Sequence, residues 1–409
     1  MNWSPIVDEK NAAPYREKLS EISDVLLEKT ETLAGNIGVM GGKAGVALFF
    51  FYYAQLTQEE KYVDFAHQLI NEIFDEINKE FSIHTLAGGL AGVGWMMEHL
   101  VQNDFVEADT DEILEPLDPF LHKAMIYDIE KGNYDFLHGA VGSGTYFISR
   151  LAKKDSETYL KELVDHLDKI GHKFDDLGGA IAWRSQLDRE KETEGYNLSL
   201  SHGLASIIVF LAKLLEKDIY TEKVSYLLDS SVRYMLAHRL DTEKFQSNFP
   251  SWIGTDYPLS HSRLAWCYGD LGIGLALWQA AQSAKNKEWQ EVAVKTLLHS
   301  TNRKDLKENA VIDAGLCHGA AGMAHIYNRA YHYMGNDTFK ETALYWLENT
   351  LKLATYEDGY AGYKAWHTEK YGGWVAEAGL LEGIAGIGLM LVSMLSDIEP
   401  NWDRCLFIS

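Results

Sequence analysis

The chain has 409 residues and a formal net charge of −23, from 37 Lys and Arg against 60 Asp and Glu. Nucleic-acid binding depends on neutralising phosphates with basic side chains, so this balance argues against a nucleic-acid partner. Three cysteines without a C-x-x-C pair argue against a disulfide scaffold. The first residues show no signal-peptide pattern, and no apolar run approaches the ~18–20 residues that span a bilayer. We therefore expect a cytoplasmic globular protein.

A glycine-centred phrase recurs seven times, as GGKAG, GGLAG, HGAVG, HGLAS, YGDLG, HGAAG and EGIAG. Successive phrases are separated by 47 to 66 residues, a period typical of stacked copies of one supersecondary unit. The residue just before the leading glycine should occupy equivalent places in the copies, and in three of them it is histidine. The leading glycines are Gly42, Gly89, Gly139, Gly203, Gly269, Gly319 and Gly383.

The elements expected in chain order alternate between two kinds of helix. An apolar run follows every phrase and is apolar nearly all round, which is typical of a buried helix. A more polar, amphipathic helix precedes every phrase, and Pro116 and Pro119 should interrupt the third one. The simplest arrangement is all-α, with seven outer helices around seven inner ones and residues 1–409 as one domain. The amphipathic helices are expected over residues 15–33, 61–80, 111–131, 156–174, 221–240, 286–303 and 337–354.

Two long stretches without periodicity, residues 175–196 and 241–262, come before the fourth and fifth phrases. Long loops at equivalent helix ends commonly form the edge of a binding site. Phe249 and Trp252 are candidates for contact with a substrate there. The alternative is that these loops are ordinary connections whose aromatic side chains pack on the outer helices.

Two cysteines and a histidine suggest a metal site. Cys267, in WCYGD, and Cys317, in CHGAAG, each stand two residues before a leading glycine, and His318 follows Cys317. Equivalent places on adjacent repeats should be close in space. Three such ligands suit Zn²⁺ with a fourth position left open for chemistry. The alternative is that both cysteines are small core residues. Cys405 lies outside every phrase, and we interpret it as structural or incidental.

Two further histidines occupy the same place in the repeat as His318. His202, in LSHG, is a candidate general acid or base, and His138 a candidate for substrate contact. Asp135 lies four residues before Gly139 and would need a partner if buried, for which a histidine is suited. Each of these residues could instead have a purely structural role.

Three more residues in or beside the phrases are candidate site residues. Arg263 and Tyr268 flank Cys267, and Glu382 opens the last phrase. Their structural alternatives are a surface charge, a packed aromatic ring and a helix cap.

The WCYGD, CHGAAG and LSHG motifs, within seven glycine phrases, resemble the lanthionine synthetase C-like proteins of the class I lantibiotic cyclase type. The resemblance extends from about residue 33 to 391. Leu271 and Ser206 depart from the commoner pattern of the phrases, and so does His138, which puts substrate choice in doubt more than the reaction.

The resemblance implies an α/α toroid with a single zinc ion. It implies that Cys267, Cys317 and His318 are the zinc ligands. It also makes His202 the proton donor, with Asp135 tuning it and Tyr268 or Arg263 stabilising negative charge.

The implied reaction is Michael addition of a peptide cysteine thiol to dehydroalanine or dehydrobutyrine, which closes a lanthionine or methyllanthionine ring. The implied partners are a dehydrated precursor peptide, a dehydratase and a transporter. Two alternatives stay open. The protein could add a small thiol such as glutathione to dehydroamino acids, or it could be a binding scaffold or an α/α-barrel hydrolase. A hydrolase would need paired carboxylates in its cavity.

Overall fold

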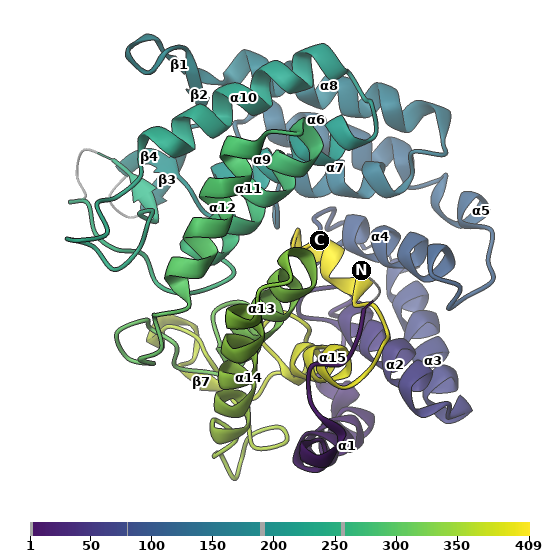
Figure 1. Ribbon diagram of the computed structural model, residues 1–409. Coiled ribbons are helices and arrows are strands. Elements are labelled where there is room, and N and C mark those ends of the chain that lie inside the picture. Colours follow the sequence, from purple (N-terminus) through teal and green to yellow (C-terminus); the bar gives the residue numbers. More distant parts are fainter. Residues whose placement is uncertain (1–2, 80, 189–192, 255–257) are drawn as a thin grey trace. The chain divides into compact units, whose positions relative to one another are not determined.

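The computed structural model describes residues 3–79, 81–188, 193–254 and 258–409. These residues form two compact units, Met1–Ala108 with Asp305–Arg404 and Asp109–Lys304 with Cys405–Ser409. Both units are built mainly of helices, as Figure 1 shows, so the expected all-α class is confirmed. None of the described helices has the length and apolar character needed to cross a membrane. The organisation of residues 1–409 as a single domain stays a prediction.

The first unit contains seven α-helices among its described residues, with one short hairpin. Helix α2 packs on α3 and on α15, and α13 packs on α14 and α15; α13 and α14 run side by side in Figure 1. The helices are α1 (Ala13–Lys29), α2 (Lys43–Thr57), α3 (Glu60–Ile77), α4 (Leu90–Gln102), α13 (Ala320–Met334), α14 (Asp337–Lys352) and α15 (Ile384–Leu395), and the hairpin strands are β6 (Ala365–Trp366) and β7 (Trp374–Val375).

The second unit follows the same alternation. Its helix α9 packs on α10 and α11, and α11 packs on α12. The helices are α5 (Thr110–Leu114), α6 (Asp118–Glu130), α7 (Ala140–Ser149), α8 (Lys154–Ile170), α9 (Leu204–Glu216), α10 (Thr221–Ala237), α11 (Asp270–Ala284) and α12 (Lys287–Ser300). The strands are β1 (His172–Phe174), β2 (Ala180–Ala182), β3 (Ser185–Asp188), β4 (Thr193–Asn197) and β5 (Trp252–Ile253). Short 3₁₀ helices in the two units are Glu9–Asn11, Thr30–Leu33, Asp175–Leu177, Glu369–Tyr371 and Asn401–Leu406.

The two expected kinds of helix are both present. In α15 every residue from Ile384 to Leu395 is buried, because its apolar side chains point in all directions. Helix α3 instead buries a stripe with helical spacing that includes Tyr62, Ala66 and Leu69. The predicted interruption of the third amphipathic helix is confirmed: α5 ends at Leu114, and α6 begins with Pro119 in its first turn.

Each leading glycine is the N-cap of a buried helix, so the seven phrases are seven equivalent helix entrances. Close packing explains why this position is occupied by glycine. A Cβ atom at Gly42 would lie 2.4 Å from the Asn36 side chain, and one at Gly319 would lie 2.4 Å from Asp313. The residue six positions before the glycine therefore occupies the space that a side chain would need.

The two long stretches before the fourth and fifth phrases contain short strands as well as loops, which the sequence did not predict. Within the described residues, β4 pairs antiparallel with β5, with Tyr196 opposite Ile253 and Asn197 opposite Trp252. This pairing joins the two stretches immediately ahead of the phrases that carry His202 and Cys267. Residues 189–192 and 255–257 of these stretches, Tyr257 included, lie outside the described residues.

Candidate functional site

In several phrases, side chains six or four residues before the leading glycine accept backbone hydrogen bonds of the turn that precedes the buried helix. Six residues before the glycine, the Asn197 Oδ1 atom accepts a hydrogen bond from the Ser199 N–H (2.9 Å). Four residues before the glycine, the Ser199 hydroxyl accepts one from the His202 N–H (3.1 Å). Asp135 does the same for the His138 N–H (2.8 Å). In these phrases the side-chain hydrogen bonds of the turn come from those positions, and they add to backbone bonds such as that from the Gly203 N–H to the Ser199 carbonyl (3.1 Å).

In the second unit, His202 and Asp135 form a hydrogen-bonded pair. The His202 Nδ1 atom lies 2.7 Å from Asp135 Oδ2, while Asp135 Oδ1 accepts the N–H groups of Leu137 and His138, both at 2.8 Å. Burial opposes ionisation of Asp135, but the hydrogen bond and charge of His202 and the His138 N–H lower its pKa. The carboxylate is therefore ionised and can only accept, so the proton of the pair resides on His202 Nδ1.

The pairing also changes the acidity of His202. Burial disfavours its charged form, but the hydrogen bond and the negative charge of Asp135 outweigh burial and raise the pKa of His202 above its ordinary value. Negative charge on the Cys267 sulfur acts in the same direction. Because Nδ1 is engaged with Asp135, Nε2 is the nitrogen left to exchange a proton with a substrate.

Aromatic rings surround this pair. The His138 ring lies 6.0 Å from the His202 ring, and the Tyr268 ring lies 6.4 Å from it on the next repeat. The Tyr268 hydroxyl accepts a hydrogen bond from Asn197 (3.3 Å), and its ring meets the edge of Trp252 at 6.0 Å. The predicted residues of three consecutive phrases are thus adjacent within this unit.

Three other predicted residues of the second unit have different environments. Cys267 is buried, and its carbonyl accepts the Leu200 N–H (3.1 Å). Arg263 is half-buried and stands six residues before Gly269. Phe249 differs from Trp252: Trp252 is 36 % exposed, whereas Phe249 is 0 % exposed and is held by Asp270 Oδ1, which accepts its N–H. The expectation that Phe249 offers a surface to a peptide does not fit this interior position.

In the first unit, His318 pairs with a residue that the sequence analysis did not single out. The His318 Nε2 atom lies 3.2 Å from Asp313 Oδ2, and both side chains are largely buried. Cys317 is buried and donates its N–H to the Leu381 carbonyl (2.9 Å), which fixes the backbone beside His318. None of the three cysteines is in a disulfide.

A second histidine and two carboxylates lie next to this pair. His367, which follows β6, lies 3.3 Å from Glu377 and 3.7 Å from Glu382. Burial raises the pKa of Glu382; His318 and His367 partly offset the increase, whereas Asp313 and Glu377 add to it. Glu382 therefore belongs to a charged cluster and does not cap α15, whose N-cap is Gly383.

Sequence reasoning missed Asp313, His367, Glu377 and Asn197. A signal for two of them was present, because Asn or Asp stands six residues before the glycine in four phrases, as Asn36, Asn133, Asn197 and Asp313. Glu377 also stands six residues before its leading glycine, Gly383, but as glutamate, so the search for Asn or Asp at this position does not find it. His367 lies in the stretch before the last phrase and occupies no repeated position.

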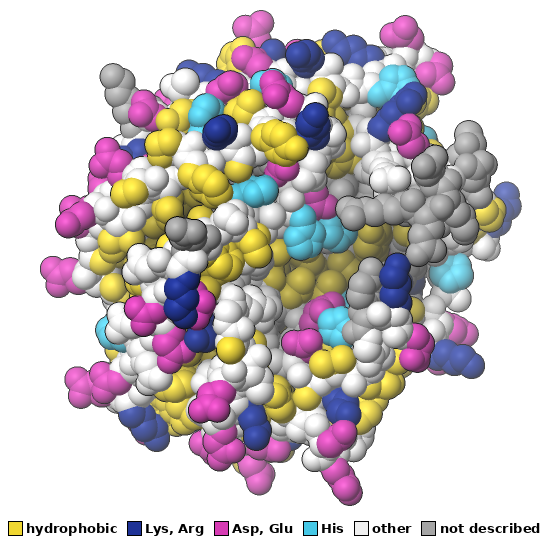
Figure 2. Space-filling view, turned by 180° about the vertical axis from the view of Figure 1, so that it is seen from behind, with side chains coloured by type: hydrophobic (Ala, Val, Ile, Leu, Met, Phe, Trp, Pro, Cys, Tyr) yellow, Lys and Arg dark blue, Asp and Glu magenta, His cyan; other side chains and the backbone are white. Residues whose placement is uncertain are grey.

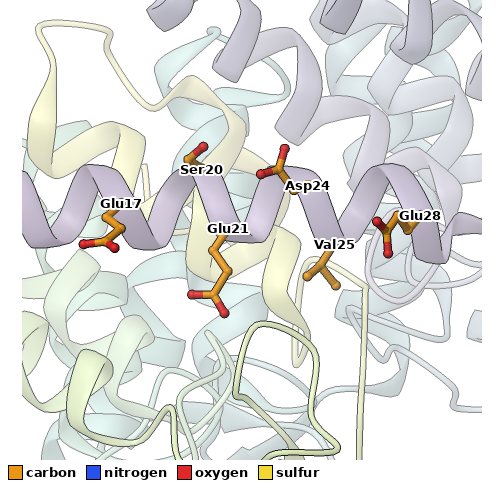
Figure 3. Close-up of a pocket in the computed structure, with 6 residues that line it drawn as sticks. All are labelled: Glu17, Ser20, Glu21, Asp24, Val25 and Glu28. Carbon is orange, nitrogen blue, oxygen red and sulfur yellow. The ribbon is translucent and has the colours of Figure 1, made fainter.

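Acidic side chains are widespread on the surface, as Figure 2 shows, so acidity alone does not mark a site. One cavity of the first unit runs along α1 and is lined by Glu17, Ser20, Glu21, Asp24, Val25 and Glu28 (Figure 3). No residue of a glycine phrase lines it.

The family model for lanthionine synthetase C-like proteins matches residues 35–407. The chain belongs to this family. It is 24 % identical over 401 residues to the nisin biosynthesis protein NisC of Lactococcus lactis subsp. lactis, covering 91 % of this chain and 89 % of that protein. A solved structure of nisin cyclase superposes with a TM-score of 0.76 at 20 % identity, covering 96 % of this chain and 97 % of that one. This likeness confirms the fold class predicted from the repeats.

Proposed function

We propose that this protein is a zinc-dependent cyclase that forms thioether rings in a dehydrated peptide. Membership of the lanthionine synthetase C-like family and the likeness to NisC support a cyclase. The observation that carries the proposal is the donor set itself: Cys267 and Cys317 stand at equivalent places of adjacent glycine phrases, and His318 follows Cys317. Two thiolates and an imidazole suit zinc and leave one of its four positions for a substrate.

The zinc ion, when bound, supplies a Lewis acid that favours the thiolate form of an incoming cysteine. The sulfur adds to the β-carbon of the dehydrated residue, and the electron pair of the double bond moves toward the neighbouring carbonyl. A proton must then reach the α-carbon. Every atom of the peptide is retained, since the proton lost by sulfur is balanced by the one gained at carbon.

His202 is the proposed proton donor. Its raised pKa increases the charged fraction near neutral pH, and Asp135 leaves Nε2 as the donating nitrogen. Tyr268, whose ring lies beside His202, is placed to stabilise the negative charge that builds up on the carbonyl oxygen, and Arg263 is proposed for the same role. Trp252, exposed beside Tyr268, and His138, beside His202, are proposed to contact the peptide.

Metal analysis tests the zinc site. We expect about one zinc per chain in the wild type and none in a Cys267→Ala, Cys317→Ala double variant. Cys405→Ala is the matched control, because Cys405 is also a buried cysteine but stands outside the phrases. Absence of stoichiometric zinc in the wild type, or its retention in the double variant, contradicts the proposal.

A thiol assay tests the reaction. Ring closure leaves the mass of a dehydrated, cysteine-bearing peptide unchanged but protects its cysteines from alkylation. Addition of a free thiol instead increases the peptide mass by that of the thiol. Enzyme-dependent loss of alkylation supports the cyclase. A mass increase with glutathione and no protection supports the small-thiol alternative, and neither change supports a binding scaffold.

A further inference from the structure

Asp313 carries a negative charge that its turn does not need. Its Oδ1 atom accepts the Gly315 N–H (3.3 Å), as Asn36 Oδ1 does for the Gly38 N–H (3.2 Å) and Asn197 Oδ1 for the Ser199 N–H. A neutral amide therefore serves the turn in other repeats. Burying a carboxylate is costly unless it is paired, and only 3 % of the Asp313 side chain is exposed. The charge at this position calls for a second explanation.

The contacts of the second oxygen of Asp313 explain this charge. Oδ2 lies 3.0 Å from the backbone nitrogen of Trp366 and 3.2 Å from His318 Nε2. Both oxygens of Asp313 act as acceptors, Oδ1 for the Gly315 N–H and Oδ2 for the Trp366 backbone N–H. An ionised carboxylate only accepts hydrogen bonds, so His318 Nε2 must carry the proton. Nδ1 is then the nitrogen with a lone pair able to bind a metal.

We propose that Asp313 is a positioning residue that selects the tautomer and the ring orientation of His318, so that Nδ1 is presented to zinc. This inference rests on the proposed zinc site. A carboxylate on the far nitrogen of a metal-binding histidine fixes its orientation and increases its basicity, and loss of such a partner typically lowers metal affinity about 10- to 100-fold. The Trp366 N–H holds the same oxygen, so the β6–β7 hairpin keeps Asp313 in place.

Asp313→Asn is the variant that isolates this role. The amide oxygen can keep the bond to Gly315, but the amide N–H₂ then faces two other donors, the Trp366 N–H and His318 Nε2–H. We expect zinc affinity, measured by competition with a chromophoric chelator, to fall about 10- to 100-fold. We also expect the absorption bands of the Co²⁺-substituted protein to shift, which a role limited to folding would not cause.

Asp135→Asn is the matched control. It makes the same change in the other His–Asp pair, and we expect its zinc affinity to equal that of the wild type. A wild type that binds no zinc overturns the proposed function together with this inference. Zinc in the wild type with undiminished affinity in Asp313→Asn overturns this inference alone.

A measurement on the wild type covers the case in which Asp313→Asn does not fold. The ¹⁵N NMR shifts of the His318 ring in the zinc-loaded protein distinguish the two tautomers. We expect a protonated Nε2 and a metal-bound Nδ1. A protonated Nδ1 contradicts the proposal, whatever the variant does.

Discussion

The two units each contain a histidine–aspartate pair at the start of a buried helix, and the two pairs are built differently. In the first unit Asp313 engages His318 through Nε2, and 3 % and 13 % of the two side chains are exposed. In the second unit Asp135 engages His202 through Nδ1, and 22 % and 33 % are exposed. The local phrase is the same, HG, in both.

The origin of the carboxylate explains the difference. Asp313 lies five residues before His318 in the same turn, whereas Asp135 comes from the phrase before that of His202. An Asp from the same turn engages Nε2, the ring nitrogen far from the backbone. Nδ1, which is close to the backbone, is then left for the metal, and this suits a rigid ligand. An Asp from the neighbouring repeat engages the near nitrogen and leaves Nε2 at the tip of the ring, which suits proton transfer. One repeated histidine can thus serve two chemistries.

Substituting the two histidines gives the sharpest test of this contrast. We expect His318→Asn to lose zinc and cyclisation together. We expect His202→Asn to keep zinc and to cyclise about 10²- to 10⁴-fold more slowly, the usual cost of removing a proton donor. Zinc content and alkylation-protection rates measured on the same samples check both. Loss of zinc from His202→Asn, or cyclisation at the wild-type rate, would remove the distinction between the pairs.

Asp135→Asn should have the next largest effect. Without the carboxylate, His202 loses the partner that keeps its proton on Nδ1, and we expect cyclisation to slow about 10- to 100-fold, as for other carboxylate partners of functional histidines. Residues that act as a unit are not additive. The double variant with His202→Asn should therefore be no slower than His202→Asn alone. Additive losses would show that Asp135 acts independently of His202.

The sequence predicted the alternation of helices because that pattern is local. Pro116 and Pro119 interrupt the third amphipathic helix as expected, and every leading glycine begins a buried helix. It did not predict which aromatic residues are exposed, because Phe249 and Trp252 are distinguished by the pairing of β4 with β5, which has no local signal. The repeated Asn or Asp position was a signal for Asp313, but its contact with the Trp366 N–H has no local signal, because Trp366 is distant in sequence.

Substitution of Trp252, the exposed aromatic residue near the His202–Asp135 pair, should reduce peptide turnover by a smaller factor. Trp252→Ala removes a ring next to Tyr268, and aromatic contacts contribute about 0.5–1.5 kcal/mol, so peptide turnover should fall by up to about tenfold. Addition of a small free thiol should be unaffected. Phe249→Ala is the contrasting variant and should destabilise the fold by about 3–5 kcal/mol, because Phe249 is a core residue. Turnover assays and thermal unfolding separate the two, and equal loss of both activities in Trp252→Ala would indicate misfolding.

The smallest effect concerns pH. The folded pKa of His202 is raised, so its pairing with Asp135 stabilises the fold fully below the unfolded value of about 6.5, and the contribution is lost as pH rises through the folded pKa. The pKa of Asp135 is lowered, so its contribution disappears as pH falls through that folded pKa. NMR titration of His202 should give a midpoint above about 6.5 that decreases in Asp135→Asn. An unchanged midpoint would show that the pair does not set the acidity of His202.

The hydrogen bonds of the turn have a consequence for how such a protein diversifies. In the phrases of Gly139 and Gly203, side chains earlier in the turn accept its hydrogen bonds, so the side chain of the histidine beside the glycine is not needed for the turn. Across the seven phrases this place is occupied by glycine, histidine, tyrosine or glutamate. The place beside the glycine is thus open to different chemistry, while the turn residues Asp313 and Asp135 also contact the histidines found there. A metal ligand, an acid or a glycine can therefore replace one another at this place without a change in the buried helix that follows.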